Sequence, residues 1–77
     1  MKQLKVLGPG CSRCEQLAQL TREAAEELEL EYELEKITDL DIFISYGLMM
    51  TPGLVVDGEL KVQGQVPSVK ELKSLLG

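Results

Sequence analysis

Two short stretches of the chain alternate between apolar and polar residues, which is the pattern of a half-buried strand. The first covers residues 3–7 and places Leu4 and Val6 on one face. The second covers residues 31–37 and places Tyr32 and Leu34 on one side, opposite a row of glutamates. Both stretches are therefore predicted to be strands with one buried side.

A hairpin signal predicts two more strands. The apolar run 54–56 is followed by Asp57-Gly58 and then by residues 59–63. An Asp-Gly pair between strand-like runs favours a two-residue turn, because both positions need a left-handed backbone. Gly64 is expected to end the second strand of the hairpin.

A helical period lies between the first two predicted strands. Over residues 12–28 the apolar positions recur every three or four residues, which makes one apolar helix face. A strand, a helix and a strand of these lengths predict a right-handed crossover between parallel strands. The apolar face comprises Leu17, Leu20, Ala24 and Leu28.

A short second helix is predicted after residue 38. Thr38 is a suitable N-cap and is followed by acidic residues, while Gly47 suits the position just beyond the last turn. We expect its inward side to contain Ile42, Phe43 and Tyr46.

A third helix is predicted to begin with a capping box. Ser68 and Glu71 have the spacing of that motif, and the inward side would contain Leu72, Leu75 and Leu76. The predicted order is β-α-β-α-β-β-α. It indicates one α/β domain over residues 1–77, with helices flanking a four-stranded mixed sheet.

Composition narrows the possible partners and location. The chain has 77 residues and a formal net charge of −5. A negative charge repels nucleic acid and anionic membranes, so we expect neither as a partner. Met1-Lys2-Gln3 leads directly into the first strand without an apolar signal segment. We therefore expect a cytoplasmic protein.

The two cysteines, Cys11 and Cys14, stand between the first predicted strand and the first predicted helix. In an intracellular protein such a pair is more often reactive or metal-binding than structural. The dipole and unpaired N–H groups of a helix N-terminus favour a thiolate and so lower a thiol pKa. Cys11, nearer the helix start, is the expected nucleophile, and Cys14, one turn further, is the expected resolving thiol.

The two residues between the cysteines allow more than one role. Arg13 adds a positive charge that would lower the Cys11 pKa further, or it is an ordinary exposed helix residue. Ser12 would cap the helix or contact substrate, and capping is favoured.

A metal carrier is the alternative function. Two thiolates suffice for Cu(I), whereas a tetrahedral zinc site needs four ligands and the chain has no histidine. Small copper chaperones also place Cys-x-x-Cys before a first helix, but they end on a strand, whereas a helix is predicted at the end of this chain. We expect a redox pair without a cofactor.

Three motifs in sequence order resemble the thioredoxin superfamily, and more specifically its small thioredoxin-like or glutaredoxin-like redox-active disulfide proteins of archaea and bacteria. They are Cys11-Ser12-Arg13-Cys14 after the first strand, Thr51-Pro52 before the hairpin, and the hairpin followed by a capped helix. The resemblance covers essentially the whole chain. It implies a minimal thioredoxin-like fold and thiol–disulfide oxidoreductase activity.

The resemblance also implies a substrate surface beside the cysteines. The Thr51–Pro52 peptide bond would be cis, and the Thr51 backbone would pair with an extended substrate. Met49 and Met50 would either form an adaptable docking surface or fill gaps in the core. The substrate-binding set is then Ser12, Arg13, Met50, Thr51 and Pro52. The implied partners are protein disulfides and an external thiol reductant or reductase, and we expect a monomer.

Overall fold

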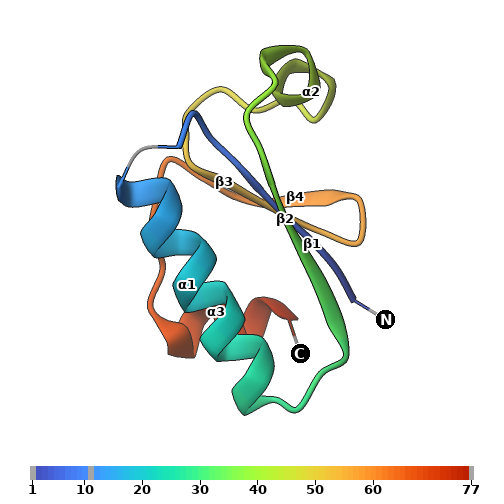
Figure 1. Cartoon of the computed structure of the whole chain (residues 1–77), viewed down its shortest axis with the longest axis vertical. Helices are drawn as coiled ribbons and strands as arrows, with labels where there is room; N and C mark the ends of the chain where they lie inside the picture. The colour runs from blue at the N-terminus through green and yellow to red at the C-terminus, as the bar shows by residue number, and fades with distance from the viewer. Residues whose placement is uncertain (1, 11, 77) are drawn as a thin grey trace.

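The computed structural model describes residues 2–10 and 12–76. Within those residues four strands form one mixed sheet in the order β2-β1-β3-β4, accompanied by helices α1, α2 and α3 (Figure 1). The predicted α/β fold and element order are confirmed. The elements are β1 Lys2–Leu7, α1 Ser12–Glu27, β2 Tyr32–Ile37, α2 Leu40–Ser45, β3 Gly53–Val56, β4 Glu59–Gln63 and α3 Val69–Leu76.

The sheet register explains which side chains are buried together. Strand β1 pairs with β2 in parallel and with β3 antiparallel, and β3 pairs with β4 antiparallel. Leu4 faces Val56 and Val6 faces Leu54 across β1 and β3. Because side chains alternate along a strand, these four residues project from the same face of the sheet.

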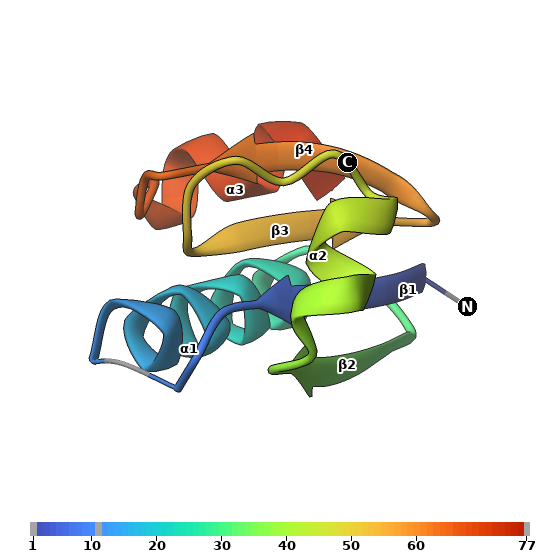
Figure 2. The ribbon, with the colours of Figure 1, turned by 90° about the horizontal axis from the view of Figure 1, so that it is seen from above.

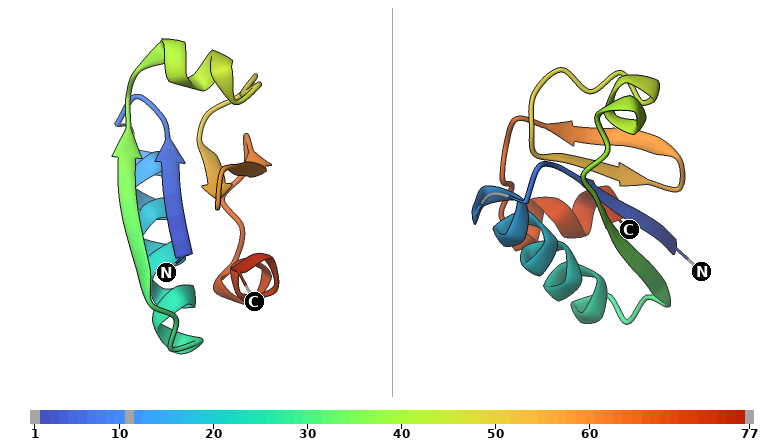
Figure 3. Two further views of the ribbon diagram at one scale, coloured as in Figure 1. Left: turned by 90° about the vertical axis from the view of Figure 1, so that its right-hand side faces the viewer. Right: turned by 45° about the horizontal axis from the view of Figure 1, so that its top comes forward.

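Helices cover both faces of the sheet, but unequally. Helices α1 and α3 lie side by side against one face, while α2 crosses the opposite face at one end (Figures 2 and 3). The larger core lies under α1 and α3 and includes Leu17, Leu72 and Leu76. The smaller core lies under α2 and is built from Leu7, Ile37, Phe43 and Val55. The predicted inward sides of all three helices are confirmed.

The start of α2 differs from the prediction. Its N-cap is Asp39 and not Thr38: the Asp39 carboxylate accepts a hydrogen bond from the Asp41 backbone N–H at 2.9 Å. Asp39 also has an extended backbone, and its carbonyl accepts the first helical N–H groups. Threonine and aspartate can both cap a helix. Which of Thr38 and Asp39 caps α2 therefore depends on where β2, the preceding strand, ends. Gly47 takes the predicted position after the C-cap, with a φ of 76°.

The hairpin and the last helix form as predicted. Asp57 and Gly58 have φ values of 50° and 85°, which fits the left-handed two-residue turn. At α3 the Ser68 Oγ accepts a hydrogen bond from the Glu71 N–H at 3.3 Å. The Ser68 hydroxyl also donates to the Glu71 carboxylate at 3.4 Å, so the two residues of the capping box contact each other as well as the backbone.

Candidate redox site

The Cys14 side chain is buried against the backbone of Gly8. It lies in the first turn of α1 and is 3% exposed. A Cβ placed on Gly8 would overlap the Cys14 Sγ and would come within 3.2 Å of the Cys14 Cβ. Position 8 therefore needs the residue without a side chain, because the sulfur occupies that space. Cys11, the predicted nucleophile, lies outside the described residues.

Pro52 forms a second wall beside Gly8. The sheet register pairs Leu7 at the end of β1 with Gly53 at the start of β3. Gly8 follows Leu7 and Pro52 precedes Gly53, so these two residues are neighbours as well. A Cβ placed on Gly8 would lie 3.9 Å from the Pro52 Cα. Pro52 is buried, Thr51 is exposed, and the peptide bond between them is cis. The fold thus brings together Cys14 and Pro52 from segments almost forty residues apart.

Arg13 joins this site to the connection between β4 and α3. Its side chain is exposed, and the guanidinium Nη2 donates a hydrogen bond to the Gly64 carbonyl at 3.0 Å. The Gly64 N–H in turn donates to the Pro52 carbonyl at 2.9 Å. No local pattern in the sequence predicts this hydrogen bond, because it joins residues that are 51 positions apart.

Ser12 is the first residue of α1. Whether its side chain caps the helix depends on the residue before it, which lies outside the described residues, so the capping role stays a prediction. The residue is exposed at the start of the helix, which is compatible with substrate contact, the other role predicted for it.

Met49 and Met50 do not fill the core. They are 86% and 62% exposed. Together with α2 they border an apolar groove of about 250 Å³, which we call the α2 groove. Among the described residues, the exposed large hydrophobic side chains (Leu40, Ile44, Met49 and Met50) all line it. The complete lining is Leu40, Phe43, Ile44, Leu48, Met49, Met50 and Thr51.

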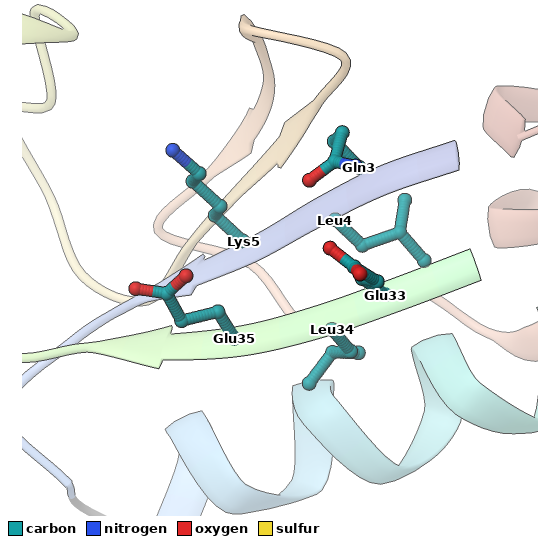
Figure 4. A pocket seen from close by; sticks show the side chains of 6 residues that line it. All are labelled: Gln3, Leu4, Lys5, Glu33, Leu34 and Glu35. Atoms are coloured by element: carbon teal, nitrogen blue, oxygen red, sulfur yellow. The ribbon is translucent and has the colours of Figure 1, made fainter. Parts of the chain in front are cut away.

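A larger hollow of about 430 Å³ lies elsewhere, along β1 and β2 (Figure 4). Its lining consists of strand residues, with Gln3, Lys5, Glu33 and Glu35 supplying the polar side chains. Neither Cys14 nor Pro52 contributes to it. The hollow is the solvated outer side of two strands, which agrees with the alternating glutamates of β2.

Two features of the described residues bear on alternative roles. Over residues 2–10 and 12–76, no three His, Cys, Asp or Glu side chains are grouped so that they could hold a metal ion. In the same part of the chain, no helix has the length and apolar character needed to cross a bilayer.

A buried thiol in the first turn of a helix, facing a cis-proline turn on this sheet topology, defines the thioredoxin-like class of α/β proteins. Comparison with known proteins agrees: the family model described as a thioredoxin domain matches residues 2–77. The chain belongs to the thioredoxin family, whose general chemistry is thiol–disulfide exchange.

Two curated relatives are similar over most of their length. One, a thioredoxin of Methanothermobacter thermautotrophicus, is 43% identical over 76 residues, which cover 99% of both chains. Another, a thioredoxin of Methanocaldococcus jannaschii, is 33% identical over 73 residues, covering 95% of this chain and 84% of the relative.

Proposed function

We propose that this protein is a thiol–disulfide oxidoreductase that reduces disulfide bonds in other proteins, with Cys11 as nucleophile and Cys14 as resolving thiol. The observation that carries the proposal is the position of Cys14, buried against Gly8 and beside Pro52. A buried thiol is poorly placed to meet a large substrate, but it is well placed to attack a sulfur held in the same turn of the helix. This supports the resolving role.

The cycle consists of two exchanges. The Cys11 thiolate attacks one sulfur of the substrate disulfide, that S–S bond breaks, and the first substrate thiolate leaves. The Cys14 sulfur then attacks Cys11, the mixed disulfide breaks, and the second substrate thiolate leaves. The leaving thiolates take up the protons that the cysteines lose. Two electrons pass from the protein to the substrate, and the Cys11–Cys14 disulfide remains.

The surroundings of Pro52 support a polypeptide substrate. Thr51 is exposed and lies directly before Pro52, so its backbone can pair with an extended chain in the manner of an added strand. The α2 groove begins at the same residue. Its volume is smaller than that of typical small-molecule pockets, which suits one apolar side chain of a client protein. Ser12, Arg13, Met50, Thr51 and Pro52 form the proposed substrate surface.

The remaining features of the proposal concern the cellular setting. Each cycle leaves the protein oxidised, so an external thiol or a reductase must restore the dithiol. We propose that it works in the cytoplasm as a monomer of one domain and without a bound cofactor. Nucleic acid and membranes are not among its proposed partners, since the net charge of −5 opposes both.

Reduction of insulin by dithiothreitol tests the activity. The protein is expected to accelerate insulin precipitation, and Cys11→Ser is expected to remove the acceleration. Gln16→Ala, which changes an exposed residue of α1 outside the proposed substrate surface and removes no thiol, should retain most of it. Full activity in Cys11→Ser would contradict the assigned nucleophile.

Copper carriage is the other chemistry open to two thiolates, and family membership favours redox exchange over it. Anaerobic competition between the reduced protein and a Cu(I) chelator separates the two. We expect insulin reduction without competitive copper binding. Tight one-to-one Cu(I) binding without insulin reduction would replace the proposal.

A further inference from the structure

Arg13 carries a positive charge that the fold holds in one place. Its guanidinium donates to the carbonyl of Gly64, so the side chain is anchored although it is exposed. A guanidinium has five N–H donors in a planar fork, and one neutral carbonyl uses a small part of that capacity. The remaining donors suit a carboxylate, which a guanidinium binds with two parallel hydrogen bonds.

The anchor point adjoins the proposed substrate surface. Gly64 donates its N–H to the Pro52 carbonyl at 2.9 Å. A Cβ placed on Gly64 would lie 3.1 Å from the Cβ and Cε atoms of Met50. The Arg13 guanidinium is therefore held at a residue that contacts both Pro52 and Met50. A client chain lying along Thr51 and Pro52 would pass beside this charge.

The charge of Arg13 is also not neutralised within the described structure. Over residues 2–10 and 12–76, ion pairs join Lys36 to Glu15 at 2.7 Å and Lys73 to Glu27 at 3.3 Å, and no carboxylate lies within ion-pair distance of Arg13. In a chain of net charge −5, this leaves an anchored cation at the edge of the proposed substrate surface.

We propose that Arg13 is a specificity-determining residue that favours client disulfides with an acidic residue next to the cysteine. This inference rests on the proposed redox function and adds a substrate class to it. The guanidinium would pair with the client carboxylate while Cys11 attacks the neighbouring sulfur. Because the pairing is local, it should change the preference among clients more than the reactivity of the thiol itself.

Three peptides test the preference. Each carries one cysteine as a mixed disulfide with thiopyridine, flanked by Asp, Ala or Lys. Pre-reduced protein is mixed with each peptide without added reductant, and thiopyridone release is followed by absorbance. The leaving group is the same throughout, and rates with a small free thiol correct for the intrinsic reactivity of each peptide.

The wild-type protein is expected to prefer the Asp peptide over the Lys peptide by about fivefold at low ionic strength, as one exposed charge pair at contact distance allows. High salt should reduce the preference. Arg13→Gln should abolish it, and Arg13→Lys should restore part of it. Arg22→Gln is the matched control: it removes the same charge from another exposed position of α1 and should leave the preference intact.

Several results would overturn the inference. One is equal rates for the three peptides with the wild-type protein. Another is an Arg13→Gln variant that slows the reaction with all three peptides equally, because a structural role of Arg13 or an effect on the thiol pKa would act on every substrate. Equal loss of preference in Arg22→Gln would indicate a general charge effect. The redox proposal fails separately, when the wild-type protein releases no thiopyridone or when Cys11→Ser releases it as fast.

Discussion

Gly8 and Cys14 show how one backbone position determines where a thiol lies. The Cys14 Sγ occupies the space that a side chain at position 8 would need, and the buried Pro52 lies next to the same position. The Cys14 thiol, for which we propose the resolving role, is thereby kept from solvent in the helix turn that follows Cys11 in sequence. This arrangement depends on a residue without a Cβ, and it can be tested by adding one.

Gly8→Ala is expected to lower the free energy of unfolding of the reduced protein by about 2 kcal/mol, because the new methyl group overpacks a filled site. Urea denaturation measures the loss. Insulin reduction should fall as well, since Cys14 must move.

A double-mutant cycle tells the specific overlap from general glycine effects. Adding Gly8→Ala to Cys14→Ala should cost at least about 1 kcal/mol less than adding it to the wild-type protein, because the sulfur is gone. An equal cost in both backgrounds would mean that the Gly8 backbone, and not the Cys14 sulfur, causes the loss.

Single residues also mark the limit of prediction from sequence. The position of Cys14 in the first helical turn followed from its spacing to the predicted helix start. The Arg13–Gly64 hydrogen bond could not be predicted from the sequence, because it joins distant segments through a long side chain. Thr21 was also missed: it is fully buried, and its hydroxyl donates to the Leu17 carbonyl at 2.7 Å. A polar residue can lie on a buried helix face when the helix itself supplies the acceptor.

At the scale of elements, the β3–β4 hairpin is attached to β1 by Asp57. Its carboxylate accepts the Gln3 backbone N–H at 2.9 Å and lies 3.5 Å from the Lys2 ammonium. The hydrogen bond from Gln3 lowers the Asp57 pKa below its ordinary value of 3.8, and Lys2 adds to the effect. A carboxyl group with a lowered pKa in the folded state stabilises the fold above its ordinary pKa, and this contribution disappears as the pH falls through the lower folded value.

Asp57→Asn is therefore expected to unfold at lower urea concentration than the wild-type protein at pH 7, while the difference shrinks as the pH falls below 3.8. Asparagine keeps the left-handed turn geometry, so the variant isolates the charge. The urea midpoints of both proteins, recorded at a series of acid pH values, measure this stability difference. A difference that stays constant down to the lowest pH would contradict the role of the carboxylate.

The α2 groove makes a separate prediction for its helix. Leu40 and Ile44 are 70% and 73% exposed, so replacing both with serine should change stability by less than about 0.5 kcal/mol per site. Insulin reduction should nevertheless fall about fivefold in kcat/KM, because client side chains lose an apolar contact. Reduction of hydroxyethyl disulfide, which is too small to reach the groove, should be unchanged. If the double serine variant reduced insulin as fast as the wild-type protein, client proteins would not bind in the α2 groove.

Element boundaries were predicted to within a few residues, because periodicity and turn residues are local signals. The first helix was expected over residues 12–28 and runs from Ser12 to Glu27. The cap of α2 was misplaced by one residue, since threonine and aspartate can both cap a helix and the tertiary structure determines which of Thr38 and Asp39 does so.

At the scale of the whole molecule, the site lies where the end of β1 meets the start of β3. The pattern of the sequence predicted a mixed sheet with helices, because strand alternation and helix stripes both report burial. It predicted the β3–β4 hairpin but not the full order β2-β1-β3-β4, since neither burial nor turn residues reveal that β1 and β3 are neighbours. That order places β1 between β2 and β3, so that Gly8 and Pro52 become adjacent and Cys14 lies beside Pro52.

Trapping of the mixed disulfide tests the central claim most directly. Reduced Cys14→Ser is incubated with insulin, and the products are analysed by mass spectrometry without reductant. The division of roles between the two thiols predicts a stable covalent adduct through Cys11, and no adduct with Cys11→Ser. An adduct through Cys14 in the Cys11→Ser variant, with none through Cys11 in Cys14→Ser, would contradict it.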